Sequence, residues 1–424
     1  MTIPSYLRLK GDTVIWVIFF LLCIISLLAV FSAGSTLSYS RGGDFWHHIK
    51  AHGMFLVAGV IICMITHDIP CNYFKFVPFF AWPLSLVLVL VVWGQDIVTN
   101  GAARWLTIGG MRFQPSELAK GAMVLTIALI LSILQDSKGA QKSAMKYILW
   151  ASLLLIVPIA AENASTGALM LLVMIVMMIL GRVPWKQIGK LALVGFAGVA
   201  FFVMMMIVMP KDNEAAIYRA PVVGKVLHRF PTWRERFTNS SMEITADPDS
   251  FVVTDENRQQ VHARIAIATC NMGVGKRPGN SVERDFLSQA YSDFIYAIIV
   301  EEYGFVGAIA IVVLYLILLY RTGLLASKCG KNFPALAAMG LAVMMVFQAL
   351  LNMMVAVGLF PVTGQTLPMI SRGGTSIIIT SVYFGIILSI SRYAHARQSQ
   401  LDKNLIEDPA DAVAVHYTDT DEVQ

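Results

Sequence analysis

The sequence predicts an all-α polytopic membrane protein with ten transmembrane helices and one large extracytoplasmic loop. Hydrophobic residues make up 57% of the 424 residues and charged residues only 14%, whereas roughly a quarter of an ordinary soluble domain is charged. Ten separate apolar runs have lengths near the roughly 20 residues that cross a bilayer. One long hydrophilic segment, 211–290, separates the first seven runs from the last three. These observations exclude a water-soluble globule.

The predicted helices follow the apolar runs at 13–33, 53–67, 76–94, 116–135, 147–164, 166–183, 190–210, 291–320, 335–358 and 374–391. The first run has no small-residue cleavage site and more runs follow it, so we expect a retained helix rather than a signal peptide. Within 211–290, Val261, Ile265 and Ala268 recur at helical spacing. This pattern predicts a short amphipathic helix on the outer membrane surface.

The chain divides into a membrane domain, 1–397, and an acidic tail, 398–424. The tail has little apolar surface to bury, which predicts disorder. Lys and Arg gather in alternate short loops, and cytoplasmic loops carry such an excess. This distribution places both termini and the tail in the cytoplasm and 211–290 outside. The clearest basic loops contain Lys138, Lys142 and Lys146, and Arg182, Lys186 and Lys190.

The net charge and the cysteines exclude other classes of protein. A formal charge of +5 is too diluted over the chain to indicate nucleic-acid binding. The five cysteines have no CxxC spacing, so neither a zinc site nor a disulfide framework is predicted.

A first charged cluster precedes and enters the fourth apolar run. Ionisable groups near spanning helices are costly, which makes each a functional candidate. Pro115 and Ser116 are helix-start residues and put Glu117 and Lys120 on one face at i and i+3. Arg104 lies just upstream. In the alternative interpretation, Glu117 only complements the helix N-terminus and Lys120 extends outward to the surface.

A second cluster surrounds the start of the eighth run. Asp293 follows the large loop and enters an apolar segment, and Glu301 lies within about a quarter turn of it on a regular helix. Glu302 would point the opposite way. The alternative role for Asp293 is a helix cap, because Ser-Asp is a good N-terminal signal.

A third cluster, 361–376, is rich in Gly and Pro and lies between the last two runs. Non-helical backbone at membrane depth is tolerated where it lines a cavity or is buried in protein. Gly373 and Gly374 also free backbone N–H groups to meet an anion. An ordinary outer turn is the alternative. The spacing in the basic stretch 273–279 matches neither a P-loop nor a dinucleotide-binding fingerprint.

Three motifs together resemble the SEDS family of shape, elongation, division and sporulation proteins. They are NGAxRW followed by QPSExxK within 100–120, DFIxAxxxEExGxxG at 293–307 and PVTGxxLPxxSxGGxS at 361–376. Their order and intervals match the family, and the resemblance covers about 11–397. The division-type branch is the closer likeness, and the elongation-type branch is the second choice.

The resemblance implies a peptidoglycan glycosyltransferase of the cytoplasmic (inner) membrane. Such a protein polymerises lipid II into glycan strands on the outer face, here at the division septum. It works with a class B penicillin-binding protein, which supplies the transpeptidase, and with other cell-division proteins. The family's essential acid matches Asp293, and its Glu and Lys match Glu117 and Lys120. Three glycines match the approach to that acid: Gly273, Gly275 and Gly279.

The sequence departs from the family pattern at three places. Where the family has QPDLGT, Ala164 replaces the usual Asp, and Glu162 is at best a substitute. Gln289 replaces a common acid shortly before Asp293. Arg372 stands where Tyr is common and adds a cation beside the glycine pair.

The implied chemistry needs a base for the acceptor hydroxyl and stabilisation of a departing lipid pyrophosphate. Asp293 is the predicted base, provided that burial raises its pKa. One displacement without an enzyme nucleophile inverts the donor anomeric carbon. A divalent cation, Mg²⁺ or Mn²⁺, could bridge the phosphates, although no ligand set is readable. The predicted substrate-binding residues are Glu117, Lys120, Arg104, Arg372, Ser371, Gly373, Gly374 and Glu301.

Two other functions compete with a polymerase. A transporter that flips the same lipid-linked precursor also fits buried charge and broken helices. Every charged cluster lies on the predicted outer side, however, and alternating access needs polar groups reachable from both faces. A non-catalytic scaffold explains the tail but leaves Asp293 without a role.

Overall fold

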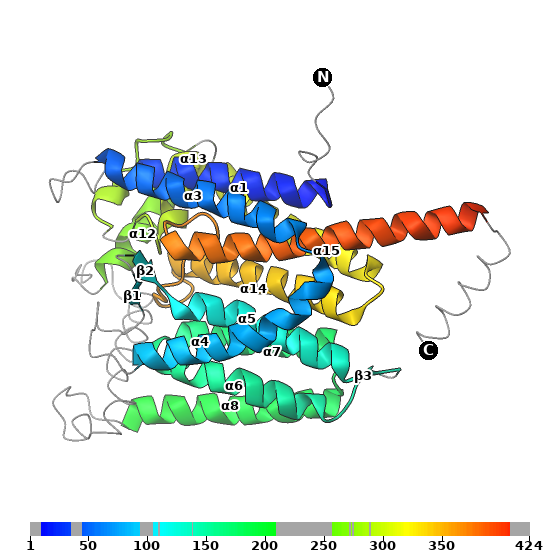
Figure 1. Cartoon of the computed structure of the whole chain (residues 1–424). Coiled ribbons are helices and arrows are strands. Elements are labelled where there is room, and N and C mark those ends of the chain that lie inside the picture. The colour runs from blue at the N-terminus through cyan, green and yellow to red at the C-terminus, as the bar shows by residue number, and fades with distance from the viewer. Residues whose placement is uncertain are drawn as a thin grey trace.

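Long helices lie side by side in one bundle (Figure 1). The computed structural model describes residues 10–34, 45–93, 105–108, 111–137, 139–208, 257–270, 273, 275–287 and 290–407. Its long helices are α1 (Thr13–Ala33), α3 (Phe45–Asp68), α4 (Val77–Trp93), α5 (Pro115–Ile133), α6 (Ala144–Glu162), α7 (Ala164–Leu180), α8 (Trp185–Val208), α13 (Ile295–Lys328), α14 (Asn332–Ala356) and α15 (Gly374–Glu407). The predicted all-helical membrane architecture is confirmed.

Each long helix overlaps one predicted apolar run. Within the described residues, eight helical segments are long and apolar enough to cross a membrane, and α7 is a shorter apolar helix. The number of ten membrane crossings therefore stays a prediction. A 3-10 turn, η2 (Cys71–Phe76), leads directly into α4.

The last two helices form the centre of the bundle. In the apolar windows of α14 and α15, 67% and 78% of the residues are buried, against 22% for the η2–α4 segment. Figure 1 shows α15 between the α1–α3 pair and α14. It packs along α3, while α14 packs against α13, α5 and α7. Peripheral α4 instead exposes large apolar side chains, including Phe79 and Phe80. Such side chains suit contact with lipid.

The connections between the helices lie at the two ends of the bundle (Figure 1). The hairpin of β1 (Leu106–Ile108) and β2 (Met111–Phe113) pairs Leu106 with Phe113 and lies at the same end as α12 (Arg258–Ala268). The second hairpin, β3 (Gln135–Asp136) and β4 (Gly139–Ala140), lies at the opposite end with the last turns of α15. The loops thus alternate between the ends as predicted. Residues 209–256 of the predicted large loop lie outside the described residues.

The predicted tail boundary is wrong. Helix α15 continues to Glu407, so 398–407 is helical rather than disordered. The Nε2 of Gln398 donates to Oδ1 of Asp402 over 3.4 Å, a contact between neighbours on one helix face. Residues 408–424 lie outside the described residues.

The predicted helix within 211–290 is present as α12, but its buried face differs from the predicted one. Val261, Ala263 and Ala266 are buried, and α12 packs against α13 and α14. Ile265 is 37% exposed. The cause is tertiary contact, because the helix packs against two neighbouring helices.

Candidate active site

Asp293 lies in a turn that precedes α13. The N-cap of α13 is Phe294, which makes no side-chain capping hydrogen bond. Asp293 itself is half-buried, whereas Phe294 is fully buried. The predicted start of the helix at residue 291 is thus four residues too early, and the N-cap residue is Phe294 rather than Asp293. A half-buried carboxylate next to a buried ring is a candidate for acid–base chemistry.

The segment 361–373 docks directly on this turn. The N–H of Arg372 donates to the carbonyl of Tyr291 over 2.9 Å, and the Ser371 hydroxyl donates to the carbonyl of Ser292 over 2.5 Å. These contacts join two sequence clusters that were predicted separately. Ser371 is 2% exposed and its hydroxyl also accepts from Leu367 N–H. In this structure the Ser371 hydroxyl therefore holds backbone on both sides.

Arg372 stands beside the Asp293 turn. Its guanidinium carbon lies 5.2 Å from the centre of the Tyr291 ring, a cation–π contact. Burial lowers the pKa of Arg372 below its ordinary value, and nearby Tyr291 acts in the opposite direction. Gly373 and Gly374 are half-buried, and Gly374 begins α15. These three predicted residues thus lie together at the start of one helix, within reach of the turn.

Two amides of α14 hold the turn and the segment 361–373 in register. The Nδ2 of Asn352 donates to the carbonyl of Asp293 over 2.8 Å and to that of Gln365 over 2.7 Å. One turn earlier, the Nε2 of Gln348 donates to the carbonyl of Thr366 over 3.0 Å. Asn352 and Gln348 were not predicted. Their signal was available in the sequence, as two amides at i and i+4 in an otherwise apolar helix.

Glu117 and Lys120 form the predicted ion pair. The Nζ of Lys120 lies 2.8 Å from Oε1 of Glu117 and donates to Oε1 of Gln348 over 2.6 Å. Lys120 is 1% and Glu117 4% exposed. Lys120 therefore does not extend to the surface as in the alternative interpretation. The pair sits beneath the segment 361–373 and reaches it through Gln348, so Lys120 is placed to support backbone rather than to contact a substrate.

Glu301 does not share a face with Asp293 in the way that was predicted. It is fully buried, and its carboxylate accepts from the Nζ of Lys276 over 2.8 Å, the N–H of Val282 over 3.1 Å and the Ser281 hydroxyl. In this structure the Glu301 carboxylate contacts the loop 275–284, and its substrate contact stays a prediction. The regular helix assumed in the prediction begins after Asp293, which explains the error.

Glu302 holds the same loop from the neighbouring position. Its carboxylate accepts from the N–H of Gly279 over 3.1 Å and from the hydroxyl of Ser32 on α1. Glu302 is as fully buried as Glu301. The two acids therefore fix the loop that leads to Asp293.

Helix α13 is interrupted at Gly304, where φ is 67° and ψ is −162°. The loop fills the interruption, because the N–H groups of Lys276 and Arg277 donate to the carbonyls of Glu301 and Glu302 over 2.9 and 3.0 Å. Gly275 makes this approach possible. It adopts a φ of 71°, and a Cβ there would lie 2.4 Å from the Gly304 nitrogen.

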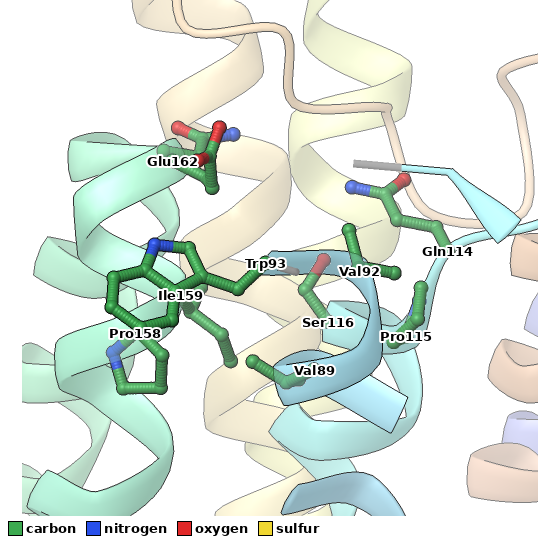
Figure 2. A pocket seen from close by; sticks show the side chains of 10 residues that line it. Val89, Val92, Trp93, Gln114, Pro115, Ser116, Pro158, Ile159 and Glu162 are labelled. Carbon is green, nitrogen blue, oxygen red and sulfur yellow. The ribbon is translucent and has the colours of Figure 1, made fainter. Parts of the chain in front are cut away.

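A pocket opens beside this network between α4, α5 and α6. Figure 2 shows the indole of Trp93 beside Pro158 and Ile159, with Gln114 and Glu162 on opposite sides. Asn163, which follows Glu162, also lines the pocket, and its Nδ2 reaches the carbonyl of Thr363 over 3.5 Å. The region that departs from the family pattern at Ala164 thus touches the segment 361–373.

Two predicted features cannot be placed or supported. Arg104 lies outside the described residues. Among the described residues, no three His, Cys, Asp or Glu side chains gather in a group that could hold a metal ion.

Comparison with known proteins gives consistent matches over nearly the whole chain. Residues 12–396 match the model of the FtsW, RodA and SpoVE family, described as cell cycle protein. A probable peptidoglycan glycosyltransferase FtsW from Nitrosomonas europaea is 30% identical over 87% of this chain and 90% of its own. One of the same name from Geobacter sp. strain M18 is 27% identical over 91% of this chain and 98% of its own.

Solved structures show the same fold. A chain from a structure described as "structural coordination of polymerization and crosslinking by a peptidoglycan synthase complex" superimposes with a TM-score of 0.67 and 24% identity, covering 91% of this chain and 98% of that one. The rod shape determining protein RodA of Thermus thermophilus gives a TM-score of 0.62 at 21% identity, covering 92% and 98%.

Proposed function

The chain belongs to the FtsW, RodA and SpoVE family of cell cycle proteins, and from this premise we propose that it polymerises lipid II with Asp293 as the general base. It is a peptidoglycan glycosyltransferase with a role in septal synthesis, as the names of its FtsW relatives support. The observation that carries the residue assignment is the junction of the Asp293 turn with the segment 361–373 through Asn352.

The reaction is a single displacement at the donor sugar. The Asp293 carboxylate accepts the proton of the acceptor hydroxyl as the hydroxyl oxygen attacks the donor anomeric carbon. A new carbon–oxygen bond forms, the bond to the lipid pyrophosphate breaks, and the pyrophosphate leaves with the electron pair. The anomeric configuration is inverted. The proton on Asp293 then returns to solvent through the half-buried side of the turn.

Arg372 is the cation that we assign to the departing pyrophosphate. Its guanidinium can bind phosphate oxygens through two parallel hydrogen bonds, and its backbone N–H is anchored to the Asp293 turn. Lys120 and Glu117 act through Gln348 as positioning residues, because their charges satisfy each other inside the bundle. The described residues offer no metal-ligand cluster, so we assign no step to a divalent cation.

The reaction takes place on the outer face of the cytoplasmic membrane in this proposal, with both termini in the cytoplasm. The distribution of Lys and Arg supports that orientation. A class B penicillin-binding protein would be the transpeptidase partner. The fold shared with a chain of a peptidoglycan synthase complex is compatible with such a partner.

A lipid-flipping transporter is the second candidate function. The bundle contains a broken helix, α13, and buried charge, both of which transporters use. The buried charges near α5 and α13 are closed ion pairs, however, whereas the half-buried Asp293 and Arg372 both lie near one end of the bundle. This one-sided arrangement favours the polymerase.

One assay separates the candidates. Purified full-length protein is given fluorescent lipid II and a class B penicillin-binding protein, and polymer and translocation are measured in parallel. We expect polymer from the wild type, and a loss of about 100-fold or more for Asp293→Asn, because a general base contributes on that scale. Asp402→Asn, an exposed substitution on α15, is the matched control.

Three outcomes contradict the proposal in different ways. Near-normal polymer from a well-folded Asp293→Asn variant removes Asp293 from the mechanism. Translocation without polymer identifies a transporter. Absence of both with the active partner present leaves a scaffold role.

A further inference from the structure

A basic groove is lined in part by Asp136 of β3. Figure 1 shows β3 at the end of the bundle opposite the β1–β2 hairpin and α12. It consists of two adjoining hollows of about 510 and 330 Å³ between the α5–α6 connection and the α7–α8 connection. Lys142 lines both hollows. The groove is separate from the candidate active site, and nothing in the proposed reaction uses it.

Cations from both connections converge on the groove. Lys142 and Lys146 come from the α5–α6 side and Arg182 from the α7–α8 side, while Asp136 is the one acid among the lining residues. All three cations are exposed. A hollow with this excess of positive charge attracts an anion.

The two connections hold each other in place. The N–H of Ala140 donates to the carbonyl of Arg182 over 3.2 Å, and the Nε2 of Gln187 donates to the carbonyl of Lys142 over 3.1 Å. Arg182 adopts a φ of 55°, which is rare outside glycine. Gly139 packs so closely that an added Cβ would lie 2.7 Å from the Arg182 carbonyl oxygen. The backbones that carry the cations are therefore fixed before any ligand arrives.

The side chains around the groove place it at the level of lipid headgroups. Trp150 lines one hollow and Trp185 the other, and they are 64% and 71% exposed. Tryptophan concentrates at membrane–water interfaces. Met145 and Leu149 extend the wall with apolar surface. A ligand with an anionic head and an apolar body matches a groove whose cations adjoin tryptophan and apolar side chains.

A buried hydrogen-bond acceptor without a partner narrows the chemical class of the ligand. The Oε1 of Gln187 is buried in the wall and has no hydrogen-bond partner among the described residues. Buried acceptors of this kind normally receive a donor. The phosphodiester of a phospholipid has no such donor, whereas a glycerol headgroup carries hydroxyls beside its phosphate.

We propose that this groove binds the headgroup of an anionic phospholipid of the phosphatidylglycerol type. The phosphate meets Lys142, Lys146 and Arg182, a glycerol hydroxyl donates to Gln187, and the acyl chains run along Met145 and Leu149. Basic pockets between spanning helices are suited to anionic lipids. The inference is independent of the proposed polymerase function.

The test measures lipids retained by the purified full-length protein with native mass spectrometry, after mixing with phosphatidylglycerol or phosphatidylcholine. The groove variant combines Lys142→Gln, Lys146→Gln and Arg182→Asn, where Asn tolerates the left-handed backbone. The control combines Lys186→Gln, Lys190→Gln and Lys331→Gln, which removes the same charge from exposed cations outside the groove lining. We expect about a fivefold loss of retained phosphatidylglycerol per groove cation and little change in the control.

Two further measurements test the proposal if the triple variant does not fold. A single Lys142→Gln variant and a thermal-shift measurement with phosphatidylglycerol apply if the triple variant folds poorly. The proposal is wrong if groove and control variants lose lipid equally, or if phosphatidylcholine is retained as well as phosphatidylglycerol. It is also wrong if millimolar inorganic phosphate displaces the lipid, since the groove would then be a site for free phosphate.

Discussion

Asn352 is the residue on which the candidate site most depends, although it carries no charge. A single amide nitrogen donates to the backbone on both sides of the site, at Asp293 and at Gln365. Leaving a buried carbonyl without its donor costs about 1–3 kcal/mol. Loss of this amide therefore lets the base move relative to the segment 361–373.

We expect Asn352→Leu, a substitution of similar shape, to lower turnover by about 100-fold, because a displacement near 1 Å has effects of that size. Substrate affinity should change little, since Asn352 is 1% exposed. Initial rates at varied lipid II concentration separate the two quantities. Asn332→Leu, at the exposed start of the same helix, is the control. A rise in the Michaelis constant at unchanged turnover would assign Asn352 to substrate binding instead.

Helix α5 contributes the buried pair Glu117–Lys120, whose role can be tested by charge removal. Lys120→Met leaves a buried carboxylate unpaired, and breaking a buried pair costs about 3–5 kcal/mol. The double variant Glu117→Gln, Lys120→Met removes both charges and should recover most of that stability. Thermal unfolding in detergent measures the difference.

Activity of the same double variant distinguishes positioning from phosphate binding. A positioning role predicts that polymerisation recovers along with stability, to within about tenfold of wild type. If stability returns while activity stays at the level of Lys120→Met alone, then the Lys120 ammonium meets the substrate. That result would restore the role first predicted from the sequence.

The interruption of α13 depends on one glycine. At Gly275 an added Cβ would lie 2.5 Å from the Glu302 carbonyl oxygen, whereas at Gly273 it would meet nothing within 4 Å. Gly275→Ala should therefore displace the loop 275–284 and lower stability by at least 1–2 kcal/mol, roughly the cost of a residue held in a strained backbone region. Gly273→Ala should be neutral. Equal melting temperatures for the two variants would contradict this account of the loop.

The elements show where sequence reasoning succeeded and where it stopped. Apolar runs predicted the positions of the long helices because helix length and hydrophobicity are local properties. The Glu117–Lys120 pair followed from i, i+3 spacing. The contacts of Glu301 could not be predicted, because they are made by a loop that folds back from residue 276. No local sequence pattern indicates such a contact.

The prediction for the end of α15 was wrong for a different reason. An acidic, polar segment suggested disorder, yet its first ten residues include several good helix formers, Gln, Leu, Lys and Glu, and they extend an existing helix. The union of the Asp293 turn with the segment 361–373 could not be derived from spacing alone. It depends on how α14 and α15 pack.

At the scale of the whole molecule, the orientation in the membrane is the principal prediction. We expect 211–290 and 359–373 to face outward, and 136–146, 322–334 and the tail from Leu401 to face the cytoplasm. Single-cysteine labelling with an impermeant reagent tests this in a variant without the five native cysteines. Asp285→Cys should label in intact cells and Lys142→Cys only after lysis. Labelling of position 142 from outside would overturn the topology.

The central position of α15 has a consequence for biogenesis. Membrane helices are made in order from the N-terminus, and the helix that fills the centre of this bundle is synthesised last. Until it arrives, the Ser26 hydroxyl on α1 lacks Ile370 and the Asn352 amide lacks Gln365. Each newborn molecule therefore passes through a stage in which most helices are inserted but their polar groups face lipid or one another. A ribosome that stalls before residue 361 leaves a membrane-bound chain that lacks both the segment 361–373 and α15.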